Sequence, residues 1–458
     1  MVKAIYKELI AAGLEFYEAA EQQEPSSLLH PNELRERINL ELQENSVSSL
    51  EIKNFVSDYF KYSTNTIHKK YMNQLWSKVE LSSIVGEFLT TVSNTSMFTY
   101  EVAPVLTLME QQMIERISKF VWNEDVKADG VMTSGGSASN LQAMMVARNT
   151  RFPKVKEEGY LGYGELKPII LCADNAHYSV KRAANILGLG HRNLVEVKTN
   201  SKGIMQADTV LETLDELQSQ GHKPFMLIST AGTTVEGAFD ELDSLGTVCQ
   251  KHNLWFHIDG AYGASVLLSE KYRYKVQGIS HCDSISWDFH KILGMNLTCA
   301  FLLIKNRGLL KSTLTSGNDS YLFHEEDNEI DQGPKSLQCG RRPDIMKLWL
   351  SWMMEGRLGL EARVDAMIES AQEFSRLVTT FDELELMFEP QFVNICFRLK
   401  NKDIKNVREK MLERGLGFIN FSEDEKGTYL RMVVSRPDLS SADHKQILDT
   451  IVSLANEA

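Results

Sequence analysis

Long apolar runs and paired cysteines are both missing from this sequence of 458 residues. No stretch approaches the ~18 uninterrupted apolar residues of a membrane-spanning helix, so we expect no membrane segment. The start of the chain mixes Lys and Glu with apolar residues at helical spacing, which is not the pattern of a signal peptide. The six cysteines form no CxxC pair, which argues against a zinc site. We therefore predict reduced, buried thiols, no metal and a cytoplasmic location.

Positive charge is the scarcer sign in this chain. Lys and Arg number 49 against 62 Asp and Glu, which gives a net charge of −13, and no basic block is present. This balance argues against a nucleic-acid partner. The hydrophobic content of 43% is sufficient for a large buried core.

Short apolar segments alternate with amphipathic helical patterns through the middle of the chain. This alternation predicts an α/β fold with a mainly parallel sheet covered on both faces. A long helix from about residue 345 predicts the connection to a smaller C-terminal α+β domain, so we divide the chain into segments 1–60, 61–345 and 346–458. The strands predicted for the sheet are 130–134, 168–174, 194–199, 224–232, 254–260, 284–287 and 298–305.

In such sheets a ligand binds beyond the carboxyl ends of the strands, so the residues that follow each strand are the candidates for a binding site. After the first strand come Gly135 and Gly136 and then a helix, whose free N–H groups suit a phosphate. The alternative is an ordinary helix start capped by Ser137 or Ser139. The motif is neither G-x-G-x-x-G nor a P-loop, which disfavours a dinucleotide or a nucleoside triphosphate.

Two further strand ends carry residues with two interpretations. His177 begins a helix after the second strand, where it either stacks on a flat ring or caps the helix. Residues 231–238 are small or carry hydroxyls, which suits either close packing against a ligand or a plain turn.

Asp259 and Lys291 follow the next strands. A buried carboxylate at Asp259 calls for a cation, although a structural ion pair would also satisfy it. Lys291 is either a solvated charge or an amine that attacks carbonyls. A phosphate cradle, a ring-stacking histidine, a buried aspartate and an amine together are what pyridoxal phosphate needs, so we predict this cofactor.

The sequence resembles the group II pyridoxal-phosphate decarboxylases, above all the glutamate and cysteine sulfinate decarboxylases, from about residue 65 to its end. The stretches that carry the resemblance are NTSMFTYEVAPVLTLME (94–110), TSGGSASN, AHYSVKRAA, TAGTTVEGAFD, HIDGAYG, DSISWDFHK, SYLF (320–323), SLQCGRRPDIMKLWLSW (336–352), EPQFVNICF (389–397) and YLRMVVS (429–435).

The resemblance implies roles around the cofactor ring. Lys291 matches the lysine that binds the cofactor covalently. Asp259 matches the partner of the pyridine nitrogen, with Ala261 beneath the ring. His177 matches the histidine on the other face of the ring, and Thr233 matches a threonine nearby.

Further roles concern the phosphate and the substrate. Arg431 matches the arginine that holds the α-carboxylate of the substrate, and Gln74 matches a glutamine near the substrate. The positions that match the surroundings of the phosphate are Gly136, Ser137, Ser284 and His290.

The fold that the resemblance implies is the type I, aspartate-aminotransferase-like fold of pyridoxal-phosphate enzymes, as an intertwined homodimer with active sites at the interface. Segment 1–60 would then be a helical dimerisation segment, 61–345 the large cofactor-binding domain and 346–458 the small domain. The activity implied is α-decarboxylation of an L-amino acid, with glutamate, aspartate or cysteine sulfinate favoured. The alternatives are 2,4-diaminobutyrate or an aromatic substrate, an aldehyde-forming decarboxylase-oxidase, and a non-catalytic binding protein.

Three stretches depart from the family pattern. The loop at 323–336 lacks the tyrosine that helps to protonate the product in many relatives, with His324 as a candidate substitute. KKYMNQL carries Lys69 and Lys70, which either favour an anionic substrate or are simply solvated. Asp288 stands in WDFHK where the animal enzymes have WNPHK, a change to a side chain of similar shape.

Overall fold

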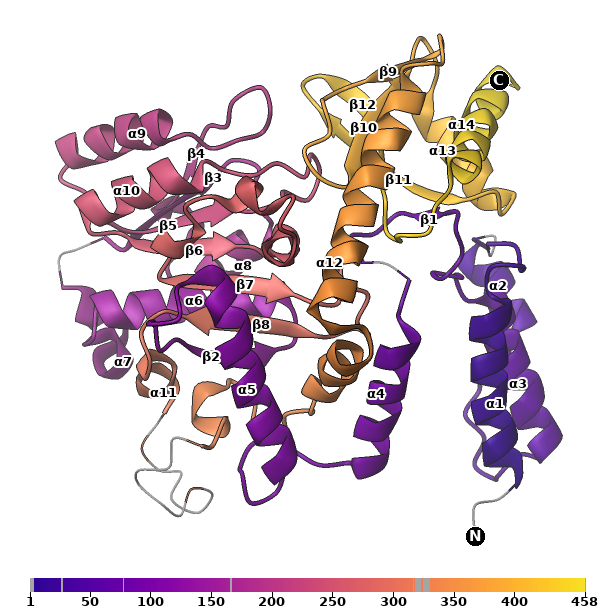
Figure 1. Cartoon of the computed structure of the whole chain (residues 1–458), viewed down its shortest axis with the longest axis horizontal. Coiled ribbons are helices and arrows are strands. Elements are labelled where there is room, and N and C mark those ends of the chain that lie inside the picture. Colours follow the sequence, from indigo (N-terminus) through magenta and orange to yellow (C-terminus); the bar gives the residue numbers. More distant parts are fainter. Residues whose placement is uncertain are drawn as a thin grey trace. The chain divides into compact units, whose positions relative to one another are not determined.

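The computed structural model describes residues 4–457 except 26–27, 77, 165–166, 316, 318–322 and 324–329. The chain divides into two units (Figure 1). The larger unit is Val79–Ile368, and the smaller unit joins the two ends of the chain, Met1–Lys78 and Glu369–Ala458. The three-segment division made from the sequence stays a prediction, because compactness by itself does not identify a dimerisation segment.

The larger unit contains a seven-stranded sheet in the order β2-β8-β7-β6-β5-β3-β4. Neighbouring strands from β4 to β7 are parallel, whereas β8 is antiparallel to both β7 and β2. The predicted α/β fold with a mainly parallel sheet is therefore confirmed. The strands are β2 (Asp129–Thr133), β3 (Ile169–Ala173), β4 (Leu194–Val197), β5 (Pro224–Thr230), β6 (Trp255–Asp259), β7 (Ser284–Asp288) and β8 (Ala300–Ile304).

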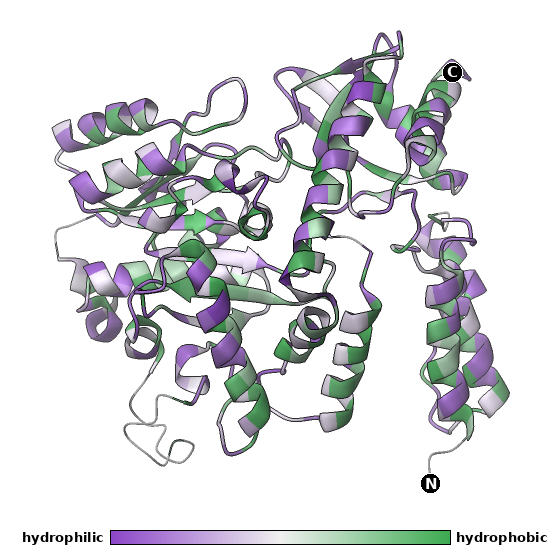
Figure 2. Ribbon diagram, in the orientation of Figure 1, coloured by the Kyte–Doolittle hydropathy of each residue, from purple (hydrophilic) through white to green (hydrophobic). Residues whose placement is uncertain are grey.

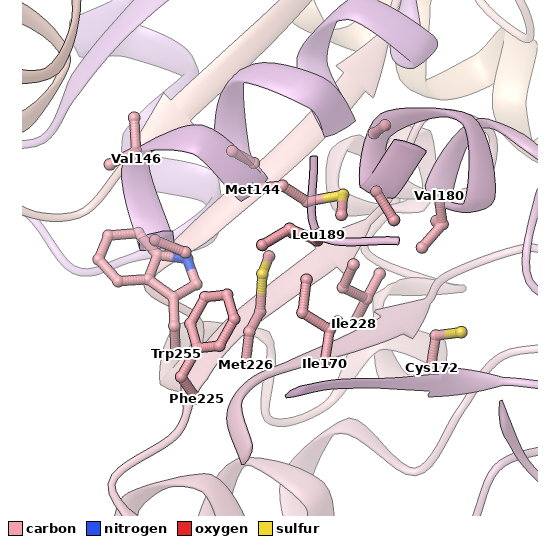
Figure 3. Packing of buried hydrophobic residues seen from close by; sticks show 14 of the residues in the cluster. Met144, Val146, Ile170, Cys172, Val180, Leu189, Phe225, Met226, Ile228 and Trp255 are labelled. Carbon is pink, nitrogen blue, oxygen red and sulfur yellow. The ribbon is translucent and has the colours of Figure 1, made fainter. Parts of the chain in front are cut away.

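Helices connect and cover these strands because the sheet is apolar on both faces. On one face, Ile170 and Cys172 of β3 and Met226 of β5 pack against Met144 of α6 and Val180 of α8 (Figure 3). Each fully buried side chain of this kind contributes about 1.5–3 kcal/mol to stability. The α-helices of this unit are α4 (Leu81–Ser93), α5 (Pro104–Val121), α6 (Gly136–Arg151), α7 (Val155–Glu158), α8 (Ser179–Ile186), α9 (Ala207–Ser219), α10 (Leu242–His252), α11 (Leu309–Leu314) and most of α12 (Ile345–Val378).

The smaller unit contains a five-stranded sheet in the order β1-β11-β12-β10-β9. Its edge strand β1 comes from the N-terminal part of the chain and pairs in parallel with β11, so that Tyr71 lies opposite Phe418. The strands are β1 (Tyr71–Met72), β9 (Leu384–Leu386), β10 (Asn394–Leu399), β11 (Phe418–Asp424) and β12 (Gly427–Val433), and the helices that lie wholly within the unit are α1 (Ala4–Ala19), α2 (Pro31–Arg37), α3 (Ser49–Tyr62), α13 (Ile404–Glu413) and α14 (Ser441–Asn456).

The cysteines carry free thiols, and all except the exposed Cys339 are buried. Burial raises the pKa of the Cys172 thiol to about 12, so this thiol stays protonated at neutral pH. Among the residues that the structure describes, no helix combines the length and the apolar character needed to cross a membrane.

Candidate active site

One edge of the seven-stranded sheet collects most of the predicted site residues. The parallel strands β3, β5, β6 and β7 end at this edge, and β2 ends there too because β2 and β7 are both antiparallel to β8. The residues at or just beyond these strand ends are Gly135, Gly136, Ser137, His177, Thr233, Asp259, Ala261, Asp288, His290 and Lys291.

The turn between β2 and α6 is built to let another group approach the backbone. Gly135 has a φ of +119°, a conformation that L side chains rarely adopt. A Cβ on Gly136 would lie 2.8 Å from the Cβ of Ala261 and 3.0 Å from Oδ2 of Asp288. No side chain caps the helix at Gly135, and the Ser139 hydroxyl instead contacts Thr133 Oγ1 at 2.7 Å. The serines therefore do not cap this helix, and it is the carboxylate of Asp288 that accepts the backbone N–H of Gly136, at 3.3 Å.

Asp259 ends β6 with a buried carboxylate that is fully engaged. Its Oδ2 accepts a hydrogen bond from Asn140 Nδ2 at 2.7 Å, and its Oδ1 accepts from Ser286 Oγ at 3.2 Å. Burial by itself raises the pKa of Asp259, but the charges of Lys291 and His177 and the bond from Asn140 outweigh it, so the pKa lies below its ordinary value. Asp259 is therefore an anion at neutral pH.

A chain of hydrogen bonds behind Asp259 was not predicted from the sequence. Trp255 Nε1 donates to Ser284 Oγ at 2.8 Å, and Ser284 Oγ lies 2.9 Å from His257 Nδ1. His257 Nε2 lies 3.1 Å from Asn140 Oδ1. Burial lowers the pKa of His257 to about 4, so the ring is neutral and donates its Nε2 proton to the amide oxygen of Asn140. This arrangement fixes the Asn140 amide so that its nitrogen faces Asp259.

Two sequence signals point to this chain of hydrogen bonds in retrospect. His257 precedes Asp259 by two residues in β6, so their side chains lie on the same face of the sheet. Asn140 lies one helical turn after Gly136 in α6. Ser284, in contrast, stands at the start of β7, four residues before Asp288, with its hydroxyl shared by Trp255 and His257. The place near the phosphate that the resemblance implies for Ser284 stays a prediction.

Stacking on a flat ring stays a prediction for His177, whereas its role at the helix start is supported, since its ring is hydrogen-bonded at the start of α8. Its Nδ1 accepts the backbone N–H of Ser179 at 3.3 Å and lies 2.8 Å from the Ser179 hydroxyl, which holds the ring at the start of α8. Burial lowers the pKa of His177, although the charge of Asp259 opposes this shift. A neutral, fixed imidazole beside the carboxylate results, and such a flat ring can also stack on another ring.

Lys291 and His290 follow β7 and share one carboxylate. Lys291 Nζ lies 3.4 Å from Asp288 Oδ2, and His290 Nε2 lies 3.6 Å from the same atom. The Nδ1 of His290 is 3.1 Å from the backbone nitrogen of Cys299, which holds the buried ring in place. Lys291 keeps 21% of its side chain exposed, so its amine remains accessible.

Thr233 is buried in the turn after β5 and already has partners. Its hydroxyl donates to Glu236 Oε2 at 3.1 Å and accepts from the backbone N–H of Ala238 at 3.0 Å. These bonds close the turn, so Thr233 has a structural role in addition to any contact with a ligand.

Gln74 and Arg431 belong to the smaller unit. Arg431 lies in β12, buried, and donates from Nη2 to the backbone oxygen of Asn73 at 2.7 Å. Gln74 directly follows Asn73 and is exposed. Lys69 pairs with Asp443 at 3.1 Å and so has a structural partner. His324, the candidate substitute for a loop tyrosine, lies outside the described residues.

The residues at the sheet edge fit pyridoxal phosphate. The partly exposed Lys291 side chain suits its aldehyde, the ionised Asp259 suits its ring nitrogen, and the N–H groups at the start of α6 suit its phosphate. Any side chain at Gly136 would clash with Ala261 and Asp288, so glycine is needed where α6 packs against the residues at the ends of β6 and β7.

Comparisons with known proteins agree with this fit. The family described as "Pyridoxal-dependent decarboxylase conserved domain" matches residues 31–400. The acidic amino acid decarboxylase GADL1 of Bos taurus is 34% identical over 449 residues, covering 93% of this chain and 85% of the relative. The cysteine sulfinic acid decarboxylase of Mus musculus is 35% identical over 450 residues, covering 93% of this chain and 90% of the relative.

A solved structure agrees as well. The crystal structure of mouse CSAD superposes with a TM-score of 0.94 at 33% identity, covering 99% of this chain and 98% of the other. The predicted type I fold, the cofactor and the class of enzyme are thereby confirmed. The chain belongs to the pyridoxal-dependent decarboxylase family and is a carboxy-lyase that uses pyridoxal 5′-phosphate.

Proposed function

We propose that this enzyme removes the α-carboxyl group of an acidic L-amino acid, with glutamate, aspartate and cysteine sulfinate as the candidates, and releases carbon dioxide and the amine. The observation that carries the proposal is the edge of the sheet that brings Lys291, Asp259 and His177 to the same side as the start of α6. The names of the relatives from Bos taurus and Mus musculus support an acidic substrate, since this chain matches both over 93% of its length.

The residues around the ring have distinct tasks in this proposal. When bound, pyridoxal phosphate supplies an electron sink for the electron pair that the departing carbon dioxide leaves behind. Lys291 provides the amine that attaches the cofactor. The ionised Asp259 would hold a proton on the ring nitrogen, and His177, Ala261 and Thr233 would line the ring, with His177 held in place by Ser179.

Three groups hold the phosphate. The backbone N–H groups of the first turn of α6 and the exposed side chain of Ser137 act as donors, and Gly136 lets the phosphate approach them. His290 contributes its Nε2 edge, because its Nδ1 edge is held by Cys299.

The substrate is recognised by residues of the smaller unit. Arg431 binds the α-carboxylate, since a guanidinium forms paired hydrogen bonds with a carboxylate. Its bond to Asn73 holds the guanidinium in place before the substrate arrives, which lowers the entropy cost of orienting the carboxylate. Gln74 lies beside the substrate.

The protein acts as a homodimer in the cytoplasm. Support for a homodimer comes from α4, which exposes a row of large apolar side chains and whose ribbon is largely green, the colour of hydrophobic residues, in Figure 2. The row consists of Leu81, Val85, Phe88, Leu89 and Val92. Exposed apolar area of this extent marks an interaction surface, and a second copy of the chain is the occupant that we propose. Support for the cytoplasm is the set of free thiols.

A product assay tests the proposed reaction. Purified protein with pyridoxal phosphate is incubated separately with glutamate, aspartate, cysteine sulfinate, 2,4-diaminobutyrate and tyrosine, and the products are identified by mass spectrometry. We expect an amine from one or more of the acidic substrates and none in the Lys291→Ala variant. Turnover of only 2,4-diaminobutyrate or tyrosine would refute the acidic substrate, and normal turnover by the variant would refute the role of Lys291.

An aldehyde-forming decarboxylase-oxidase is the second candidate. The observation that favours it is the absence of tyrosine from residues 323–336. An aldehyde product together with oxygen consumption in the same assay would select this candidate over the amine-forming reaction.

A further inference from the structure

Asp288 is a buried carboxylate aimed at the start of α6. Only 1% of the residue is exposed, and its Oδ2 accepts the backbone N–H of Gly136 at 3.3 Å. A Cβ on Gly136 would lie 3.4 Å from Oδ1, so both carboxylate oxygens face this backbone. Oδ1 has no hydrogen-bond partner among the described residues. A buried carboxylate oxygen without a partner is costly, so this position needs an explanation beyond packing.

The groups around Asp288 would serve an external anion equally well. Lys291 Nζ and His290 Nε2 lie 3.4 Å and 3.6 Å from Oδ2, and the helix start adds its N–H groups and the positive end of its dipole. The proposed function assigns the helix start and His290 to the phosphate, and it assigns the Lys291 amine to the attachment of the cofactor. Asp288 thus places a negative charge at the position where the phosphate would place its negative charge.

We propose that Asp288 competes with the phosphate of pyridoxal phosphate for the start of α6 and thereby weakens the affinity of this enzyme for its cofactor. The inference rests on the phosphate-binding role given to α6 in the proposed function. Two anions a few ångströms apart repel each other, and each takes hydrogen bonds that the other would use. Without cofactor, Asp288 caps α6 and stabilises the empty protein, which makes the cofactor readily exchangeable.

Asp288→Asn tests the inference because it removes the charge and keeps the shape. We measure the dissociation constants of pyridoxal phosphate and of pyridoxal, which lacks the phosphate, by equilibrium titration of the cofactor-free protein. Asp288→Asn should bind pyridoxal phosphate about 10- to 100-fold more tightly than the wild type, because one charged contact is worth this much. The affinity for pyridoxal should change much less.

Asp208→Asn is the matched control. Asp208 is an exposed carboxylate in the first turn of α9, so the variant changes the same net charge at another helix start. It should bind both ligands as the wild type does. A gain for pyridoxal phosphate that is equal in both variants would overturn the inference, as would an unchanged or weaker affinity in Asp288→Asn.

Thermal unfolding gives a second readout that does not depend on activity. Cofactor-free Asp288→Asn should unfold at a lower temperature than the cofactor-free wild type, and saturating pyridoxal phosphate should raise its midpoint by more. If Asp288→Asn does not fold, Asp288→Ser is measured in the same way, and an unchanged cofactor affinity in Asp288→Ser would overturn the inference. Failure of the proposed phosphate site at the start of α6 is a distinct outcome. In that case the wild type itself would bind pyridoxal and pyridoxal phosphate equally well.

Discussion

Asn140→Ala should lower both the thermal stability of the protein and its affinity for pyridoxal phosphate. The side chain donates to Asp259 Oδ2 at 2.7 Å and to Ser179 Oγ at 3.0 Å, and it accepts from His257 at 3.1 Å. Each of these partners is buried. The variant therefore removes a bond to a buried anion and leaves a buried imidazole N–H without a partner.

The size of the effect follows from these contacts. A hydrogen bond to a charged group is worth about 1.5–3 kcal/mol, and an unsatisfied buried donor costs about 1–3 kcal/mol more. The two contributions sum to about 2.5–6 kcal/mol, which corresponds to a decrease of roughly 3–6 °C in the thermal midpoint of a chain of 458 residues. The loss of the bond from Asn140 also raises the pKa of Asp259 toward its ordinary value, which weakens its pairing with the cofactor ring.

Thermal unfolding and cofactor titration measure both effects. Gln142→Ala is the control, since Gln142 is a buried amide in the same helix whose Oε1 has no hydrogen-bond partner among the described residues. This control should lose about 1 kcal/mol, the typical effect of a single substitution. A midpoint in Asn140→Ala no lower than that of Gln142→Ala would refute the argument that Asn140 holds Asp259 in place.

Three further predictions concern other parts of the structure. Arg431→Ala should lower kcat/KM for the substrate by about 100-fold or more, since a paired charged contact is lost, with cofactor occupancy unchanged by absorbance. Gly136→Ala should destabilise the protein by about 1–3 kcal/mol, because the new Cβ lies 2.8 Å from that of Ala261. The control Gly13→Ala in α1 should not destabilise the protein, because a Cβ there meets nothing within 4 Å. The third prediction concerns pH. Burial lowers the pKa of His257 to about 4, below the ~6.5 of a histidine in an unfolded chain. Between these two pH values the unfolded chain therefore binds more protons than the folded one. Stability should fall by up to roughly 3 kcal/mol as the pH drops through this window, and His257→Gln should flatten the decrease in thermal midpoint.

Each of these predictions has an outcome that contradicts it. Loss of cofactor with unchanged substrate kinetics would remove Arg431 from substrate binding. Equal stability of Gly136→Ala and the wild type would mean that the turn after β2 relaxes at no cost. A pH dependence of stability that is identical in His257→Gln and the wild type would show that His257 is not buried as a neutral ring.

The amino-acid sequence alone determines the class of the fold and the place of the site. The order of apolar strands and amphipathic helices predicts a mainly parallel sheet, because each pattern reflects how a short segment buries its own side chains. The strand ends in turn predict the glycine turn before α6, the buried Asp259 and the accessible Lys291. These features depend on residues that are close together in the sequence, so the sequence is sufficient to predict them.

Contacts between distant residues are decided only by the tertiary structure. The hydrogen-bond chain through Asn140 and His257 joins residues 117 positions apart, and it also includes the hydroxyl of Ser284. The carboxylate of Asp288 accepts a hydrogen bond from Gly136, which lies 152 positions away in the chain. Aspartate in place of the asparagine of the animal enzymes keeps the shape of the side chain but adds a negative charge at the start of α6. Crossover connections bring such residues together, and no local periodicity records which side chains will then share a buried hydrogen bond.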